Sequence, residues 1–188
     1  MVKNIMIVGV GGQGTLLTSR IIGKVALAEG KDVKISEVHG MAQRGGSVVT
    51  FVRFGDEVYE PVVEEGDADV IIAFERLEAL RYAHFLKKDG VLIVNDCRME
   101  PMTVVIGSAE YPEGIIEGLS AKHEVHSIDG QKIALELGNS KVLNSAVLGY
   151  AAKYVGFDKE AWLGTIESTV PPKTVDINKK AFLAGYEA

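Results

Sequence analysis

The chain has 188 residues, of which 47% are hydrophobic, and a domain of this length buries enough surface to fold without disulfides. Its 26 acidic residues outnumber its 20 basic residues, and the net charge of −6 argues against a broad nucleic-acid-binding face. The single cysteine, Cys97, excludes an internal disulfide and any iron–sulfur cluster or structural zinc site built from thiolates of this chain alone. We expect one domain over residues 1–188 and no nucleic-acid partner.

An apolar run near the N-terminus is interrupted by glycines after about six residues, so it is too short for a signal-peptide core or a membrane span. A free thiol also fits a reducing compartment. We therefore expect a cytoplasmic protein with no membrane partner.

The first third of the chain predicts one helix among several strands. The helix has apolar residues at helical spacing from Leu17 to Ala28, and Gly30 ends it. Gly55-Asp56 is typical of a hairpin turn leading into Val58-Tyr59, and a turn this short joins antiparallel strands, so the sheet is expected to be mixed. Apolar and β-branched runs predict strands over Ile5–Val8, Val33–Val38 and Val48–Phe54.

The remainder predicts a second strand–helix–strand unit and then mainly helices, with Gly90 marking a connection and Pro171-Pro172 a break. The predicted strands are Val70–Phe74, Val91–Val94 and, more weakly, Val104–Ile106 and Glu124–Ile128. The predicted helices are Arg76–Leu86, Lys132–Leu137, Val142–Tyr154, Lys159–Ser168 and Asp176–Gly185. Together they predict a three-layer α/β fold with a mixed, mostly parallel sheet, a Rossmann-like first βαβ unit and a helical C-terminal third.

A glycine-rich turn between the first strand and the first helix is the leading candidate for a binding site. A strand that enters such a turn leaves backbone N–H groups free at a helix N-terminus, where the helix dipole favours an anion. Gln13 adds a side-chain amide that can donate to a phosphate or carboxylate and accept from a neighbouring chain. The candidate residues of this turn are Gly9, Gly11, Gly12, Gln13 and Gly14. The alternative is a tight turn that only lets the helix pack on the strand.

A second glycine-rich patch, His39–Ser47, follows the second strand and reads as neither helix nor strand. Parallel strands end at the same edge of a sheet, so we expect this patch to lie beside the first one. Arg44 can form a forked contact with a carboxylate or phosphate, and its glycine neighbours favour contact with a ligand or partner. The alternative is that Arg44 pairs with an acidic side chain of this chain while His39 caps a strand. The candidate site residues here are Gln43, Arg44, Gly45 and Gly46.

Other titratable residues give weaker signals, and we assign no catalytic or metal-binding residue. His123 and His126 lie three apart, so on a strand they would face opposite sides, and no cysteine or carboxylate cluster completes a metal site. His84 is expected to offset a helix dipole, and the acidic residues between Glu64 and Asp69 to form a solvated turn.

Taken together, the motifs resemble the gamma-type component of the 2-oxoacid:ferredoxin oxidoreductases, thiamine-diphosphate enzymes that oxidatively decarboxylate 2-oxoacids. Within that family, His39–Ser47 is similar to the beta subunit of the indolepyruvate enzymes, whereas the pyruvate and 2-oxoglutarate relatives tend to carry Tyr-Gly-x-Glu-x-Arg-Gly-Gly. The motifs that carry the resemblance run over nearly the whole chain: Gly9–Gly14, Glu37–Ser47, Ala68–Glu75, Asn144 with Leu148-Gly149, and Ala181–Glu187.

The resemblance implies a small subunit, inactive by itself, of an enzyme that converts an arylpyruvate, coenzyme A and oxidised ferredoxin into an aryl-acetyl-coenzyme A, carbon dioxide and reduced ferredoxin. It also implies a large alpha subunit that carries thiamine diphosphate, Mg²⁺ and the iron–sulfur clusters. The chain itself has neither the cysteines for clusters nor an evident acidic diphosphate motif, which fits this division. The two glycine patches would then face coenzyme A or the active-site approach.

Three alternatives stay open. The enzyme could act on another 2-oxoacid, namely pyruvate, 2-oxoisovalerate or 2-oxoglutarate. The chain could be a free-standing NAD-type oxidoreductase in which Glu37, at the end of the second strand, holds a ribose hydroxyl. It could also be a scaffold whose glycine loops only pack against a partner. The segment after Glu37 argues against the NAD-type reading, because a helical crossover is expected there.

Overall fold

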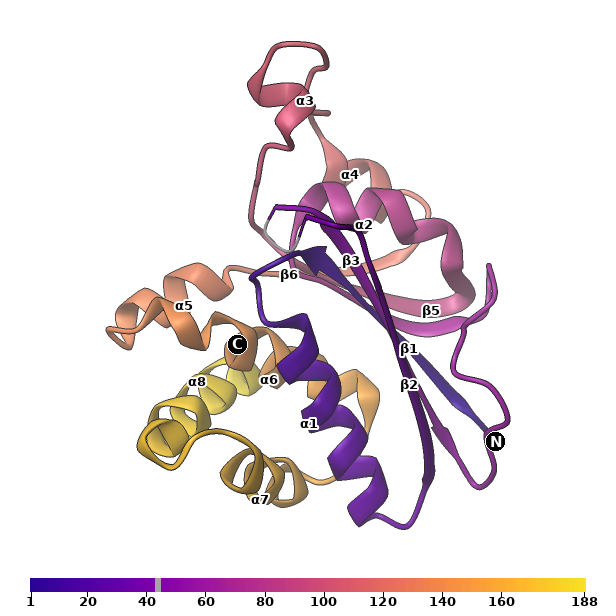
Figure 1. Ribbon diagram of the computed structural model, residues 1–188, viewed down its shortest axis with the longest axis vertical. Helices are drawn as coiled ribbons and strands as arrows, with labels where there is room; N and C mark the ends of the chain where they lie inside the picture. The colour runs from indigo at the N-terminus through magenta and orange to yellow at the C-terminus, as the bar shows by residue number, and fades with distance from the viewer. Residues whose placement is uncertain (43–44) are drawn as a thin grey trace.

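The computed structural model describes residues 1–42 and 45–188, and its centre is a six-stranded sheet in the order β2-β3-β1-β4-β5-β6 (Figure 1). Strands β1, β4, β5 and β6 are parallel, while β3 is antiparallel to both β1 and β2. Strand β2 therefore runs in the same direction as β1. The strands are β1 (Lys3–Val10), β2 (Asp32–His39), β3 (Ser47–Gly55), β4 (Ala68–Ala73), β5 (Leu86–Asn95) and β6 (Glu124–Ile128).

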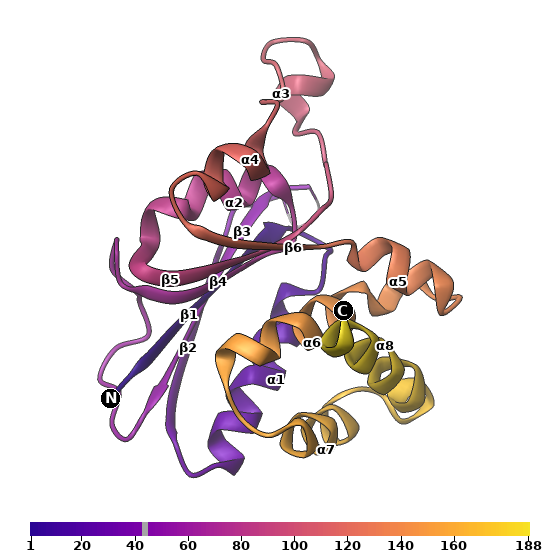
Figure 2. The same ribbon diagram turned by 180° about the vertical axis from the view of Figure 1, so that it is seen from behind.

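Helices cover both faces of the sheet, as the two opposite views show (Figures 1 and 2). One face carries α1 (Thr15–Ala28), α5 (Gly130–Glu136), α6 (Leu143–Val155), α7 (Lys159–Thr169) and α8 (Val175–Glu187). The other face carries α2 (Arg76–Tyr82), which a 3₁₀ turn at Ala83–Phe85 extends, and α4 (Ile115–Ser120). The expected three-layer, mixed and mostly parallel α/β fold is confirmed. No helix in the described part of the chain is long and apolar enough to cross a bilayer.

The runs Ile5–Val8 of β1 and Val70–Ala73 of β4 are apolar at every position because these stretches are buried on both faces of the sheet. Along β1, Ile5 and Ile7 join the core beneath α1 and α6, while Met6 and Val8 join the core beneath α2 and α4. The continuous apolar run that predicted a doubly covered strand thus supplies both cores.

The predicted hairpin after Gly55 is wrong, although the sheet is mixed as expected. Both edges of β3 are already paired, with β1 on one side and β2 on the other, so Val58-Tyr59 has no strand edge to join. Val58 is instead buried, and its backbone N–H donates to the Asp32 carboxylate at 2.8 Å.

Several predicted boundaries also differ. The helix predicted over Arg76–Leu86 ends at Tyr82 and is followed by the 3₁₀ turn, and Leu86 is the first residue of β5. Gly90, predicted to mark a connection, lies inside β5, close to a register shift between β4 and β5. The weak strand predicted at Val104–Ile106 is the short helix α3 (Met102–Val105), and α4 was missed because its first turn follows a glycine with no side-chain cap.

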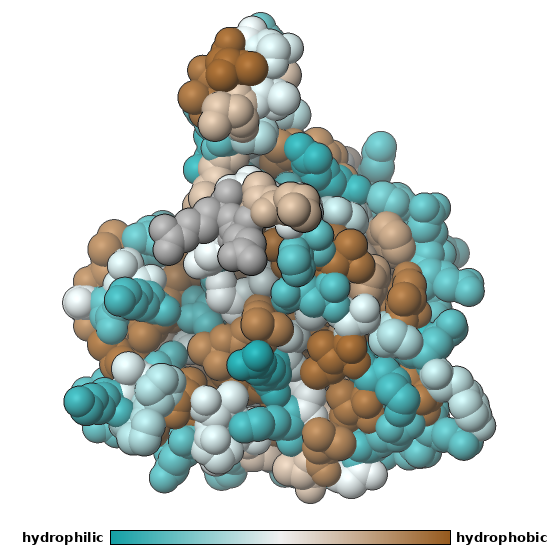
Figure 3. Space-filling view, in the orientation of Figure 1, coloured by the Kyte–Doolittle hydropathy of each residue, from teal (hydrophilic) through white to brown (hydrophobic). Residues whose placement is uncertain are grey.

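Helix α3 stands on a segment that projects from the body of the molecule (Figure 1). The large apolar side chains Met102, Val105 and Ile106 are exposed on this segment. The space-filling view shows a hydrophobic patch on one side of the projecting tip (Figure 3). These apolar side chains are therefore not buried in either core of this chain.

Helices α6 and α8 pack backbone against backbone through two glycines. A Cβ atom on Gly149 would lie 1.9 Å from the carbonyl oxygen of Phe182, and one on Gly185 would lie 1.9 Å from that of Ala146. Both glycines belong to the motifs that carried the family resemblance, and here their role is the close contact between helices.

We predict that Gly149→Ala lowers the free energy of unfolding by about 3 kcal/mol, because the added methyl group forces the two helices apart. Gly164→Ala is the matched control, since it lies in α7 with nothing within 4 Å of its Cβ position. It should stabilise the chain by about 0.5 to 1 kcal/mol through the greater helix propensity of alanine. Urea unfolding measures both variants, and equal effects would contradict the packing account.

Candidate functional site

The two glycine patches meet at the carboxyl ends of β1 and β2. The N–H of Gly11 donates to the carbonyl oxygen of Gly46 at 2.8 Å, and the N–H of Gly45 donates to that of Gly11 at 3.3 Å. The expectation that both patches lie at one edge of the sheet is therefore confirmed. Gln43 and Arg44 lie outside the described residues.

The first patch turns sharply between β1 and α1. Gly12 and Gly14 have φ angles of +105° and +87°, which residues other than glycine rarely adopt. Gly14 is the N-cap of α1 and offers no side chain to the first helical N–H groups. The turn therefore presents free backbone donors at the positive end of a helix of 14 residues.

The side-chain amide of Gln13 stabilises this turn by hydrogen bonds to the backbone of its own chain. Its Oε1 accepts from the N–H of Val10 at 2.7 Å, and its Nε2 donates to the carbonyl oxygen of Phe74 at 3.0 Å. The sequence led us to expect an amide directed at a ligand or another chain. The structure directs it to the end of β1 and the chain just beyond β4, so Gln13 shapes the surface that the glycines present.

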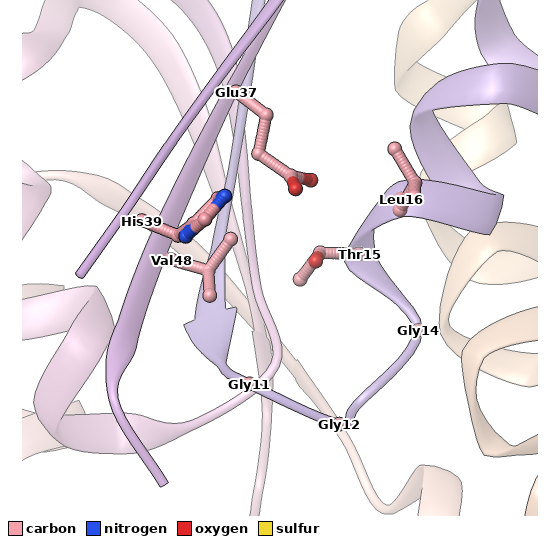
Figure 4. Close-up of a pocket in the computed structure, with 8 residues that line it drawn as sticks. All are labelled: Gly11, Gly12, Gly14, Thr15, Leu16, Glu37, His39 and Val48. Carbon is pink, nitrogen blue, oxygen red and sulfur yellow. The ribbon is translucent and has the colours of Figure 1, made fainter. Parts of the chain in front are cut away.

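A cavity of about 410 Å³ opens beside the turn, between the start of α1, the end of β2 and the start of β3. We call it the Glu37 cavity. Glu37 and His39 extend from β2 toward Thr15 at the start of α1, with Gly11, Gly12 and Gly14 along the lower rim (Figure 4). The Glu37 carboxylate accepts from the Thr50 hydroxyl at 3.1 Å.

The position of Glu37 differs from that of the ribose-binding carboxylate in a dinucleotide-binding fold. There the second strand is a direct neighbour of the first, whereas here β3 lies between β1 and β2. The residues after Glu37 also lead directly into β3 without a helical crossover among the described residues. The strand order thus weakens the NAD-type alternative.

A buried acidic pair supports the second patch from the opposite face of the sheet. Glu75 caps the start of α2 by accepting from the N–H of Glu78 at 3.0 Å, and it also accepts from the N–H of Met99 at 3.0 Å and from the hydroxyl of Tyr111 at 2.5 Å. These three donors fix the position of the Glu75 side chain. Sequence reasoning missed this pair, although Glu75 ends one of the motifs of the resemblance.

Glu78 connects the pair to the glycine loop. The hydroxyl of Ser47, which directly follows Gly46, donates to the Glu78 carboxylate, and Arg81 lies 3.3 Å from the other carboxylate oxygen. Burial raises the pKa of Glu78, and the neighbouring Glu75 adds to the rise, while Ser47 and Arg81 oppose it. Glu78 is therefore a mostly buried carboxyl group with a raised pKa, next to the glycine loop.

The weaker candidates have local roles. His126 lies 2.9 Å from Glu124 and packs on Tyr154, and His84 lies 3.6 Å from Glu65. His123 precedes β6 and is not part of it. The described residues contain no group of three or more histidine, cysteine or acidic side chains that could hold a metal ion.

We predict that Glu78→Gln gains stability relative to the wild type as the pH rises from about 4 to 7. The pKa of Glu78 is raised above its ordinary 4.5 in the folded chain, so the folded state binds this proton more tightly than the unfolded state. That contribution is present at low pH and is lost as the pH rises through the folded pKa. Urea unfolding at both pH values tests it, with the exposed Glu160→Gln as control. A difference that is constant or of opposite sign would contradict it.

Comparisons with known proteins identify the family. The model of the family "Pyruvate ferredoxin/flavodoxin oxidoreductase" matches residues 4–188. The chain is 42% identical to the indolepyruvate oxidoreductase subunit IorB of Thermococcus kodakarensis, with 98% of this chain and 95% of that protein covered. It is 44% identical to the protein of the same name from Archaeoglobus fulgidus, with 97% and 93% covered.

Solved structures agree with these matches. The gamma subunit of a keto/oxoacid ferredoxin oxidoreductase from Geobacter sulfurreducens superposes with a TM-score of 0.73 at 26% identity, covering 98% of this chain and 96% of that one. The pyruvate oxidoreductase subunit PORC of Thermotoga maritima gives a TM-score of 0.75 at 25% identity, covering 99% and 96%. The chain therefore belongs to the pyruvate ferredoxin/flavodoxin oxidoreductase family and is similar over its whole length to the gamma-type subunits of 2-oxoacid:ferredoxin oxidoreductases.

Proposed function

We propose that residues 1–188 form one domain that serves as the small subunit of a 2-oxoacid:ferredoxin oxidoreductase acting on arylpyruvates such as indolepyruvate. The observation that carries this proposal is the graded similarity to named relatives. Identity is 37 to 44% with four subunits named for indolepyruvate, and falls to 29 to 30% with subunits of pyruvate and ketoisovalerate enzymes. The amino-acid sequence of His39–Ser47 also favours the indolepyruvate branch of the family.

The reaction joins an oxidation to an acyl transfer. The bond between the carboxylate and the carbonyl carbon of the 2-oxoacid breaks, and carbon dioxide leaves. The acyl group then forms a thioester with the sulfur of coenzyme A, whose thiol loses its proton to solvent, and the two electrons released pass to oxidised ferredoxin. Thiamine diphosphate supplies the electron sink for the decarboxylation.

We assign thiamine diphosphate, Mg²⁺ and the iron–sulfur clusters to a larger partner subunit. The lone Cys97 is half-buried, and burial raises the pKa of its thiol, which makes it a poor ligand for a cluster. The apolar tip around Met102, Val105 and Ile106 suits burial against such a partner, because apolar side chains that gather on an exposed projection are typical of interaction sites.

The glycine surface is this chain's contribution to the shared active site. We propose that the free N–H groups at the start of α1, together with Gly11, Gly12, Gly45 and Gly46, contact coenzyme A or line its approach. The uncapped helix N-terminus fits the phosphates of that molecule. Gln43 and Arg44 remain candidate contacts from the sequence.

We expect the complex of this chain with its partner to reduce ferredoxin faster with indolepyruvate or another arylpyruvate than with pyruvate, 2-oxoisovalerate or 2-oxoglutarate. Kinetics of the complex purified from its native cells, with each 2-oxoacid in turn, measure this preference. A partner without thiamine diphosphate, or a preference for pyruvate, would sink the proposal. Tight binding of NADH to the purified chain would instead support the free-standing oxidoreductase.

A charge placed at Gly12 tests the contact with coenzyme A. Asn and Asp tolerate positive φ better than most residues, so Gly12→Asn and Gly12→Asp carry similar backbone strain but differ by one charge. We predict that Gly12→Asp raises the KM for coenzyme A about tenfold above that of Gly12→Asn, as expected when a charge replaces a favourable site for an anion. If both variants lose assembly and the remaining complex keeps a normal KM, the loops serve only as a scaffold.

A further inference from the structure

After β5 the chain leaves the body of the molecule as a projecting arm, residues 98–113, which carries α3 (Figure 2). Every residue from 102 to 110 is exposed except Val104, which is half-buried. Among the described residues, the hydrogen bonds made by residues 102–110 all lie within the segment 101–110. The direction of the arm is therefore set mainly at its base, where its two ends join the body.

The buried carboxylate of Glu75, a residue that is 1% exposed, holds both ends of the arm. Its Oε1 accepts from the N–H of Met99 at 3.0 Å, where the arm leaves, and from the hydroxyl of Tyr111 at 2.5 Å, where the arm returns. Its Oε2 accepts from the N–H of Glu78 at 3.0 Å, which fixes the carboxylate on the first turn of α2. Burial and the Glu75 carboxylate raise the pKa of Tyr111, so its hydroxyl stays protonated and remains a donor.

Arg98 covers the base of the arm from the solvent side. Its guanidinium carbon lies 4.4 Å from the ring centre of Tyr111, and its nitrogens pair with Glu100 and Glu113, each at 3.1 Å. Exposed ion pairs stabilise a structure little, and the guanidinium over the aromatic ring adds a cation–π contact. The hydrogen bonds to the buried Glu75 carboxylate are therefore the main attachment, and Arg98 adds to it.

The base of the arm adjoins residues 45–47 of the second glycine patch, with a cavity of about 120 Å³ between them. The two sides of this cavity include Gly45, Ser47, Met99, Glu100 and Pro101. Glu78, on the same helical turn as Glu75, accepts from the hydroxyl of Ser47. The arm and this part of the glycine patch therefore share one support, the first turn of α2.

We propose that Glu75 is a positioning residue for assembly, which fixes the arm so that its apolar tip and residues 45–47 meet the larger partner subunit as one preformed surface. The identity of that partner rests on the proposed function. The tip side chains Met102, Val105 and Ile106 are exposed, and the base of the arm is continuous with the glycine surface that faces the same partner. An arm without this attachment would have to be ordered on binding, and that ordering costs conformational entropy.

Binding of the full chain to the larger subunit that co-purifies with it tests the proposal. Tyr111→Phe removes one donor and leaves Glu75 its two backbone donors, so the variant should fold. We expect this variant to raise the dissociation constant for the larger subunit about tenfold, because binding must then order the arm. Glu75→Gln keeps an acceptor oxygen for the arm and should bind more tightly than Glu75→Ala.

Ile166→Val is the control for lost stability, because it removes one methyl group from the core on the other face of the sheet. Urea unfolding checks that it loses about as much stability as Tyr111→Phe. We expect it to leave the dissociation constant for the larger subunit unchanged. In the isolated chain, NMR relaxation should show the backbone order parameter of Ile106 falling from about 0.85 in the wild type to below about 0.6 in Tyr111→Phe.

A charge at the tip separates positioning from a merely structural role. Ile106 is 67% exposed, so Ile106→Asp should leave the fold intact and weaken binding to the larger subunit. Adding Tyr111→Phe to Ile106→Asp should have little further effect, because Glu75 acts on binding through the tip.

Four results overturn the inference: equal weakening by Tyr111→Phe and Ile166→Val, additive effects of Tyr111→Phe and Ile106→Asp, an arm as well ordered in Tyr111→Phe as in the wild type, or unchanged binding in Ile106→Asp. Self-association of the wild-type chain that Ile106→Asp abolishes, with binding to the larger subunit unchanged, assigns the tip to a second copy and also overturns it. A complex that assembles as expected but is inactive on every 2-oxoacid overturns the proposed function alone, because binding does not depend on turnover.

Discussion

The carbonyl oxygen of Phe74 is the point on which the site end of the sheet depends. This oxygen lies just beyond the end of β4 and accepts hydrogen bonds from Nε2 of Gln13 at 3.0 Å and from Nδ2 of Asn95 at 3.1 Å. Asn95 in turn accepts from the N–H of Gly130 at 3.0 Å, and Gln13 accepts from that of Val10 at 2.7 Å. The half-buried amide of Gln13 and the buried amide of Asn95 therefore tie the ends of β1, β4 and β5 to the start of α5 and hold the glycine turn in place.

From that turn, the surface extends in three directions with different chemistry. Glu37 places a carboxylate on one side, Lys141 and Asn144 place donors on the other, and the buried Glu75–Glu78 pair holds the second glycine loop through Ser47. This arrangement suits a subunit that positions a ligand for chemistry on a partner.

Much of this could be predicted from the sequence, for reasons that specific residues show. The run Ile5–Val8 and the glycines after it predict a strand, a turn and a helix because local sterics and burial act together there. The place of β3 between β1 and β2 could not be predicted, because strand order depends on long-range pairing. The inward bonds of Gln13 were equally hidden, since only the folded chain brings Phe74 beside it.

The central claim is that the free amides of the glycine turn bind an anionic group of coenzyme A within an assembled enzyme. Hydrogen–deuterium exchange of this chain in the complex, with and without coenzyme A, measures it directly. The account predicts slower exchange at Gly12, Gly14 and Thr15 when coenzyme A is present, because their N–H groups gain an acceptor. Unchanged exchange at these residues, with protection only on the partner subunit, would contradict it.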